Sequence, residues 1–326
     1  MDDVSDEVSM INLNSGVIDN QPAVANDSAY SVNSEEGDNS NIATYLNSET
    51  QELKLDLDSY DFTTQNIRSN YYLEKEITSS SHSDPKQLFI SHFNIRSLNK
   101  NFDQFSIFIN ELRFENAVIG LSETWLKDSS PSSLFSIDGY KLITNNRKNK
   151  KGGGVGFYVS EDLNYELLQN CSFMLESLEC IFIEIKLPKK GNIIVGEIYR
   201  PPNSNPAQFI EMLDGLLSDN FFHNKSCFIM GDFNLDLLNC SNNPPSQDFL
   251  SLMLSKSFLP LTRKPTRISD NSATLIDNIF FNSLYSDVSS GIIVSDLTDH
   301  LPIFALLSNM STTKTQPTNF GFRNMS

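Results

Sequence analysis

Residues 227–234 read CFIMGDFN, in which four mostly apolar residues are followed by Gly-Asp-Phe-Asn. A short apolar run that ends in turn residues is typical of a strand buried inside a sheet. Gly231, Asp232 and Asn234 also favour turns, so a turn without any function is the competing interpretation. The pattern predicts a buried strand that presents polar side chains where it ends.

The same arrangement recurs along the chain. Polar residues stand at or just past the ends of other apolar, strand-like runs: Asn94, Glu123, Tyr199, and the pair Asp299 and His300. Each of them alone could be an exposed strand end or a histidine with ordinary hydrogen bonds. Because a rigid sheet fixes the side chains at its strand ends, their joint presence predicts a functional site there.

Strand-like segments outnumber helical ones in this sequence. Apolar residues recur at spacings of three and four over residues 101–114 and 206–217, which predicts two amphipathic helices. Most other apolar runs have the length and β-branched composition of strands. This alternation predicts an α/β fold in which two sheets pack on each other and helices lie outside.

The net charge of −17 at first argues against a nucleic-acid binder, because phosphates repel an acidic surface. The charge is uneven, however: residues 1–85 carry −14 and the remainder carries −3. We therefore predict three parts, with a Ser/Asn-rich, acidic and disordered tail over 1–85. A single domain is predicted over 86–310, followed by a short tail over 311–326.

The sequence lacks an N-terminal signal peptide and any apolar run long enough to span a bilayer. The four cysteines form no CxxC pair, which favours reduced thiols and disfavours a structural zinc site. We expect a monomeric intracellular protein, nuclear or cytoplasmic, without a membrane partner.

The polar strand ends belong to longer stretches that together resemble the endonuclease/exonuclease/phosphatase superfamily. Within it, the chain is most similar to the apurinic/apyrimidinic-type endonuclease domain of non-LTR retrotransposons. The stretches run in family order: Phe93–Leu98, Leu121–Leu126, Gly152–Val159, Tyr199–Pro202, Gly231–Asn234, Ala273–Phe280 and Thr298–Ile303. The resemblance implies a DNase I-like, four-layered α/β sandwich of two mixed sheets with helices outside.

The resemblance also implies roles. Mg²⁺, with Mn²⁺ as the alternative ion, would be held by Glu123, with Asn94 beside it and Asp299 as a second, partly indirect carboxylate. The implied catalytic residues are Asp232, Asn234, His300, Asp277 and Tyr199. Asp232 would act as the general base, and Asp277 would orient His300 toward the phosphate. Residue spacing leaves open which of Asp232, His300 and Tyr199 is the base.

DNA is the partner that the resemblance implies. The expected contacts are basic residues near the motifs: Arg96, Arg147, Lys148, Lys150, Lys151, Arg200, Arg263 and Arg267. A solvated basic turn is the alternative for the lysine-rich segment before Gly152. Trp125, the only tryptophan, is expected to pack beneath Glu123 and not to stack on a base.

The function that follows is a Mg²⁺-dependent DNA endonuclease that nicks one strand and leaves a 3′-hydroxyl. Nothing in the sequence resembles a reverse transcriptase, so we expect a solitary or truncated retrotransposon module that does not copy RNA. Two alternatives stay open: a superfamily phosphatase acting on a small phosphoester, and a catalytically silent or domesticated interaction protein.

Overall fold

The computed structural model describes residues 51–53, 69–80, 87–112, 114, 117–148, 150–187, 191–282 and 288–308. The chain divides into two units, residues 1–36 and 37–326, and all described residues belong to the second. None of the helices in this described part is long and apolar enough to cross a bilayer.

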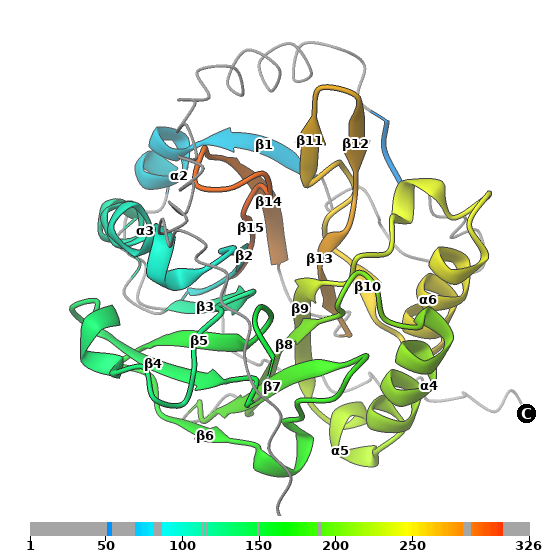
Figure 1. Ribbon diagram of the computed structural model, residues 1–326, viewed down its shortest axis with the longest axis horizontal. Coiled ribbons are helices and arrows are strands. Elements are labelled where there is room, and N and C mark those ends of the chain that lie inside the picture. The colour runs from blue at the N-terminus through cyan, green and yellow to red at the C-terminus, as the bar shows by residue number, and fades with distance from the viewer. Residues whose placement is uncertain are drawn as a thin grey trace, which may run out of the picture. The chain divides into compact units, whose positions relative to one another are not determined.

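The first of two large sheets contains seven described strands and mixes parallel with antiparallel pairs (Figure 1). In spatial order its strands are β1 (Asn70–Leu73), β14 (Val288–Val294), β15 (Ile303–Leu307), β2 (Leu88–Asn94), β3 (Ala117–Ser122), β5 (Val155–Ser160) and β4 (Tyr140–Asn145). β2 and β3 are parallel neighbours, so their carboxyl ends meet at one edge.

The second large sheet contains six described strands and is also mixed. Its order is β10 (Leu259–Pro260), β13 (Asp277–Phe281), β9 (Ser226–Asp232), β8 (Ile193–Tyr199), β7 (Glu179–Ile185) and β6 (Tyr165–Leu167). The parallel pair β8 and β9 lies near its centre. A separate hairpin joins β11 (Arg267–Ser269) to β12 (Ser272–Thr274).

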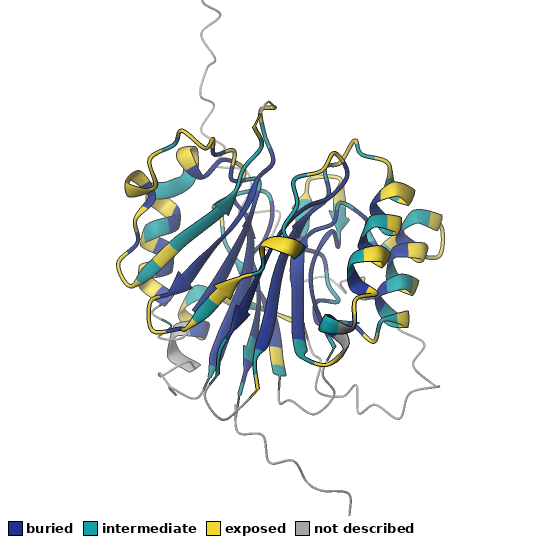
Figure 2. Ribbon diagram, turned by 90° about the horizontal axis from the view of Figure 1, so that it is seen from below, coloured by how far each residue is buried: buried dark blue, intermediate teal, exposed yellow. Residues whose placement is uncertain are grey.

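Helices cover the outer faces of both sheets, as Figure 2 shows with buried strands in the middle and exposed helix faces on either side. The helices are α2 (Glu74–Ser80), α3 (Leu98–Leu112), α4 (Pro206–Leu217), α5 (Asn220–His223) and α6 (Pro244–Ser255). Short 3₁₀ turns are η2 (Ser132–Phe135), η3 (Gln169–Cys171) and η4 (Leu237–Asn239). The predicted α/β sandwich of two mixed sheets with helices outside is confirmed.

Three apolar cores correspond to the three contacts between these layers. One lies between the sheets and includes Val118, Ile183 and Phe228. A second packs α3 on the first sheet, since Phe105, Ile109 and Leu112 follow the helical spacing of three and four. A third packs α4 and α6 on the second sheet. The sheets are thus held rigidly, which fixes the edge where their strands end.

The boundary predicted at residue 86 is too late, because β1 and α2 precede it. β1 pairs in parallel with β14, and Ile77 of α2 is buried in the core beneath α3. Leu53 is also buried, and its backbone N–H donates to the carbonyl of Arg263 at 2.8 Å. Residues 1–50, 54–68 and 81–85, and the tail predicted over 311–326, lie outside the described residues.

Candidate active site

Strand ends from both sheets converge at one edge. Asn94 is the last residue of β2, and Glu123 directly follows β3. In the second sheet, the register places Tyr199 beside Asp232, and Asp232 opposite Asp277. Except for Asp277, which only the family resemblance implied, these residues were predicted to share a site from their positions after apolar runs, and the topology brings them together.

The loops after these strands contain left-handed, non-glycine residues: Arg96 (φ 42°), Ser97 (φ 88°), Glu123 (φ 52°), Trp125 (φ 54°) and Asn234 (φ 48°). Backbone hydrogen bonds hold this geometry, since Ser97 N donates to Glu123 O and Trp125 N to Gly153 O, both at 2.8 Å. Such backbone strain costs about 1–3 kcal/mol per residue and gathers at functional sites. Here it aims the side chain of Glu123 toward Asn94.

The amide of Asn94 connects the two sheets. Its Nδ2 donates to Asp232 Oδ2 at 2.8 Å and to Glu123 Oε1 at 3.1 Å. Asn94 is buried, as is Asp232, while Glu123 is partly exposed. One amide group therefore sets the spacing between a carboxylate of each sheet, because both of its hydrogens are in use.

Asp232 receives two hydrogen bonds from Asn234, whose backbone N–H donates to Oδ1 at 2.9 Å and whose Nδ2 donates to Oδ2 at 3.1 Å. Asn234 Nδ2 also donates to the carbonyl of Arg200 at 2.8 Å. Burial, aided by the charge of Asp277, raises the pKa of Asp232 to about 7. Its carboxylate is therefore a stronger base than an exposed aspartate.

Arg200 was predicted to contact DNA, and the structure shows that this prediction is wrong. Its side chain is buried, and its guanidinium donates to the backbone carbonyls of Phe233 at 2.7 Å and Asn234 at 2.7 Å. Further bonds reach the carbonyls of Pro201 and Ser204. Arg200 instead braces the turn that carries Asp232 and Asn234.

His300 and Asp277 form a buried pair, as predicted. The imidazole Nδ1 donates to Asp277 Oδ1 and Oδ2, both at 3.0 Å. Burial opposes the charged imidazolium, but the Asp277 carboxylate outweighs this and raises the pKa of His300 to about 9. Thr266, which sequence reasoning missed, donates its hydroxyl to Asp277 Oδ2 at 2.7 Å. His300 is thus oriented and protonated at neutral pH.

A second buried histidine lies behind this pair and was also missed. His92 contacts Asp277 Oδ1 through Nε2 at 3.3 Å and Glu197 Oε1 through Nδ1 at 2.8 Å. Both His92 and Glu197 are almost completely buried. The sequence does contain a signal for these two residues, because each is an ionisable residue in the middle of an apolar strand: His92 in β2 and Glu197 in β8. The polar chain thus runs from His300 through Asp277 and His92 to Glu197.

Tyr199 lies in the same buried edge. Burial, together with the charges of Glu123 and Asp232, raises the pKa of its phenol above the ordinary value. The hydroxyl therefore keeps its proton at neutral pH and can donate a hydrogen bond. A protonated phenol disfavours Tyr199 as the general base, an assignment that residue spacing left open.

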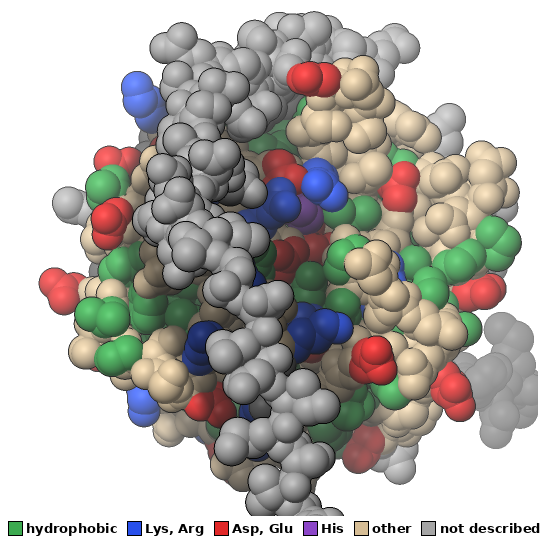
Figure 3. Space-filling model, in the orientation of Figure 1, with side chains coloured by type: hydrophobic (Ala, Val, Ile, Leu, Met, Phe, Trp, Pro, Cys, Tyr) green, Lys and Arg blue, Asp and Glu red, His purple; other side chains and the backbone are tan. Residues whose placement is uncertain are grey.

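On the face shown in Figure 3, a histidine lies in a hollow among acidic and basic side chains. A family model described as the Endonuclease/Exonuclease/phosphatase family matches residues 91–300, which is more than half of the chain. The chain belongs to this family. The matched residues contain Asn94, Glu123, Asp232 and His300. A separate search of curated proteins found no match to the sequence.

Solved structures share the fold at low sequence identity. The AP endonuclease LMAP from Leishmania major is 13% identical, with a TM-score of 0.57 over 82% of this chain and 98% of that chain. The endonuclease domain of TRAS1, a telomere-specific non-LTR retrotransposon, is 12% identical, with a TM-score of 0.52 over 69% and 99%. The 3′ phosphatase NExo from Neisseria, bound to product DNA hairpin, is 15% identical, with a TM-score of 0.50 over 67% and 98%.

The family implies a divalent cation, and the donor set at Glu123 fits one. Mg²⁺ keeps several waters and needs one or two carboxylates, and the Glu123 carboxylate is partly exposed beside Asn94. Asp299, predicted as a second carboxylate, is instead held by Arg96 at 2.5 Å and Arg267 at 2.7 Å. Its two oxygens are thus already paired with guanidinium groups.

A second group of side chains could also hold a cation. Among the described residues, Asp232, Asp277 and His300 bring ligand atoms within 4.8 Å of one another. Because the Asp277 carboxylate raises the pKa of His300, a cation there would have to displace a proton from the imidazole. Asp277 already accepts hydrogen bonds from His300 and Thr266.

The predicted DNA contacts fall into two groups. Lys148, Lys150 and Lys151 are exposed, and about half of each Arg96 and Arg267 side chain is exposed although both pair with Asp299. The other three arginines, including the buried Arg200, are occupied by protein groups. Arg147 forms an ion pair with buried Glu179, and Arg263 donates to Leu53 O at 2.8 Å and pairs with Glu52.

Trp125 differs from the expectation that it packs beneath Glu123. Its indole N–H does donate to Glu123 Oε2 at 3.2 Å, so the contact with Glu123 is present. The side chain is nevertheless 38% exposed. Trp125 therefore borders the site and leaves part of its ring open to solvent.

Proposed function

We propose that this chain is a Mg²⁺-dependent DNA endonuclease that nicks one strand and leaves a 3′-hydroxyl. The observation that supports this best is that two groups of side chains with different chemical roles meet at one edge of the two sheets. Glu123 and Asp232 are spaced by Asn94, and a protonated His300 is held opposite them by Asp277. Phosphodiester hydrolysis needs a base for water and a charged donor for the phosphate, and this edge offers both.

Asp232 acts on the attacking water. Its carboxylate accepts the water proton as the water oxygen forms a bond to phosphorus and the bond from phosphorus to the 3′-oxygen breaks. The backbone and side-chain donors of Asn234 fix which way the carboxylate points. A pKa of about 7, raised by burial, matches a base that works near neutral pH.

His300 and Tyr199 act on the phosphate. The imidazolium donates from Nε2 to a non-bridging oxygen, where negative charge builds up in the transition state, while Nδ1 stays on Asp277. The protonated phenol of Tyr199 donates to the same group. Glu123, with Asn94 beside it, would hold Mg²⁺, which supplies Lewis-acid stabilisation of charge on the phosphate and the leaving oxygen.

DNA is the substrate that the comparisons favour, since similar folds occur in AP endonucleases and in a protein bound to product DNA hairpin. The likeness to the TRAS1 endonuclease domain supports a retrotransposon origin. Exposed Lys148, Lys150 and Lys151 supply charge for phosphate contacts. A second candidate is a phosphatase acting on a 3′-phosphate, because the NExo structure carries that description.

A nicking assay tests the proposal. Purified full-length chain is incubated with supercoiled plasmid and Mg²⁺, beside Glu123→Gln, His300→Ala and the control Glu211→Gln, whose side chain is exposed on α4. We expect open circles from wild type and control, and a rate lower by about 10²–10⁴-fold for the two site variants. DNA ligase should reseal the nicks, since it requires a 3′-hydroxyl beside a 5′-phosphate.

The alternatives give different results. A phosphatase would release inorganic phosphate from a 3′-phosphorylated oligonucleotide and leave the plasmid supercoiled. A catalytically silent interaction protein would do neither. Equal plasmid profiles from wild type and both site variants would reject the nuclease assignment.

A further inference from the structure

A groove of about 690 Å³ is lined in part by Trp125, whose indole N–H donates to Glu123 Oε2. Its apolar part consists of Leu126 and Phe135, which are buried, and Trp125, whose ring is partly exposed. This volume is within the range of about 300–1,000 Å³ that small-molecule sites in proteins occupy. The groove therefore has room for a nucleotide.

The rim of the groove is basic. Lys127, Lys148, Lys150 and Lys151 are all exposed there, and none of the described residues that line the groove is acidic. Arg147 also lines it but is paired with Glu179. Four exposed ammonium groups around an apolar floor complement a phosphate backbone that carries a flat, apolar base.

Trp125 is held so that its ring cannot withdraw into the core. Its backbone has a left-handed φ of 54°, its N–H donates to Gly153 O at 2.8 Å, and its indole N–H donates to Glu123 Oε2 at 3.2 Å. A large ring that is 38% exposed yet fixed at two points is ready to stack without losing much conformational freedom.

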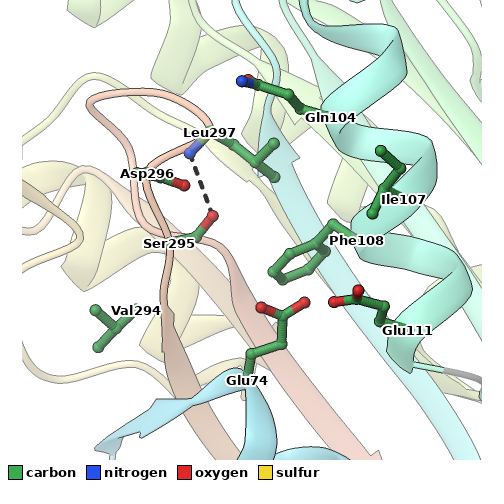
Figure 4. Close-up of a pocket in the computed structure, with 9 residues that line it drawn as sticks. All are labelled: Glu74, Gln104, Ile107, Phe108, Glu111, Val294, Ser295, Asp296 and Leu297. Carbon is green, nitrogen blue, oxygen red and sulfur yellow. Dashed lines mark hydrogen bonds between the residues drawn. The ribbon is translucent and has the colours of Figure 1, made fainter.

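A second pocket shows the opposite chemistry. It lies between α2, α3 and the loop after β14, where the carboxyl groups of Glu74 and Glu111 face each other (Figure 4). Burial, and the proximity of Glu111 and Asp296, raise the pKa of Glu74. Acidic groups repel phosphate, so this pocket offers nucleic acid nothing. Its exposed Ile107 serves below as a control position.

We propose that the groove beside Glu123 binds an unpaired nucleotide of the DNA strand, with its base stacked on Trp125 and its flanking phosphates on the lysines. This rests on the proposed function for the substrate class, DNA. Because the indole donates to the same Glu123 that borders the reacting phosphate, the stacked base lies next to the scissile bond. The preferred substrate is then DNA with an unstacked base at the cleavage site, and not a continuous duplex.

Intrinsic fluorescence tests stacking directly, since Trp125 is the only tryptophan in the chain. The full-length protein is titrated, in EDTA to prevent hydrolysis, with single-stranded oligothymidylate and with a fully paired duplex of equal length. We expect saturable quenching by oligothymidylate at low concentration and much weaker quenching by the duplex. Binding of oligothymidylate without any change in Trp125 emission would overturn the proposal.

Substitutions of Trp125 distinguish binding by ring stacking from binding by any large apolar side chain. Binding of labelled oligothymidylate is measured by anisotropy for Trp125→Phe, Trp125→Leu and Ile107→Ala, each checked for folding by circular dichroism. Leu should weaken binding by about 5- to 150-fold, because base–aromatic stacking has that strength. The Trp125→Phe variant should keep most of the wild-type affinity, and the Ile107→Ala variant should bind as tightly as wild type. Equal binding by the Leu and Phe variants would reject stacking.

Basic rim residues give a further check. Lys151→Ala should lower the slope of binding against salt by about 1, whereas Lys141→Ala, exposed at the other end of β4, should leave it unchanged. These binding readouts need no catalysis. If the protein does not nick plasmid but oligothymidylate still quenches Trp125 and the Trp125→Phe variant still binds, the groove assignment stands and the nuclease assignment falls. If the protein nicks plasmid but neither binding result is obtained, only the groove assignment falls.

Discussion

At the scale of single residues, Arg200 and Asn94 decide whether the carboxylate of Asp232 is correctly placed. Asn94 approaches from the first sheet, while Arg200 fixes the turn after β9 from within the second. Neither residue needs to touch a substrate for this. The site therefore depends on buried polar side chains whose role is to hold other side chains still.

We predict that Arg200→Lys lowers the free energy of unfolding by about 2–4 kcal/mol. A lysine cannot span the carbonyls of Phe233, Asn234 and Ser204, and buried acceptors would lose their donors. Urea denaturation measures the loss. The salt dependence of DNA binding should match wild type, because no phosphate contact is removed. A shallower salt slope at unchanged stability would mean that Arg200 contacts DNA after all.

Sequence reasoning found the side chains at strand ends but not those that support them. Asp232 and His300 stand beside turn residues, where a polar side chain is conspicuous. His92, Glu197 and Thr266 lie inside or beside apolar segments, and nothing local says that they meet across two sheets. Arg200 was misassigned because charge alone does not distinguish a guanidinium that faces solvent from one that is buried against carbonyls.

At the scale of elements, β1 and α2 complete the first sheet. β1 covers the edge of β14, Tyr72 packs against Phe304 at a ring distance of 5.6 Å, and Ile77 enters the core under α3. Open edges and exposed apolar surface both favour aggregation. The segment therefore belongs to the domain, although its sequence was assigned to a disordered tail.

We predict that a chain beginning at residue 87 is less stable than one beginning at residue 51. The shorter chain uncovers β14 and removes the buried Ile77, at about 1.5–3 kcal/mol for a fully buried large apolar side chain, together with the partly buried Tyr72. Thermal unfolding and light scattering compare the two chains. Identical melting temperatures and monodisperse samples would show that β1 and α2 contribute nothing to the domain.

The mainly apolar strands and the amphipathic helices were predictable, and a strand of polar sequence was not. β2, β3, β7, β8 and β9 are mostly apolar runs, and α4 begins after a capping Asn205 whose side chain accepts from Ala207 N at 2.9 Å. β14 contains Ser289, Ser290 and Gly291, which look like a turn when read locally. Its strand conformation comes from pairing on both sides, which is a tertiary effect.

At the scale of the whole domain, the buried His300–Asp277 pair links stability to pH. The pKa of His300 is raised from about 6.5 in the unfolded chain to about 9, because the Asp277 carboxylate outweighs the effect of burial. The folded state thus binds more protons above pH 6.5. Its stability is fully present below pH 6.5 and is lost as pH rises toward 9.

We predict that the free energy of unfolding falls between pH 6.5 and 9, by about 1.4 kcal/mol per pH unit at most from this group. Urea titrations at pH 6.5, 7.5 and 8.5 measure the slope. His300→Gln should make it shallower, since glutamine does not titrate. A slope should remain from His92, because Glu197 and Asp277 outweigh the effect of burial and raise its pKa to about 10. A free energy that stays constant or rises over this range, with wild-type protein, would contradict the assignment of a protonated His300.

Gly120 of β3 has a consequence for how the two sheets are set against each other. A Cβ at this position would lie 2.1 Å from Glu197 Oε2, so the carboxylate of one sheet occupies the space that the other sheet leaves free. Sliding the sheets by two residues along β3 would bring Val118 or Ser122 to that place, and its side chain would collide with the Glu197 carboxylate. An interface made only of aliphatic side chains would tolerate several alignments of the two sheets. Here only one setting accommodates the charge, and it is the one that brings Asn94 within reach of Asp232.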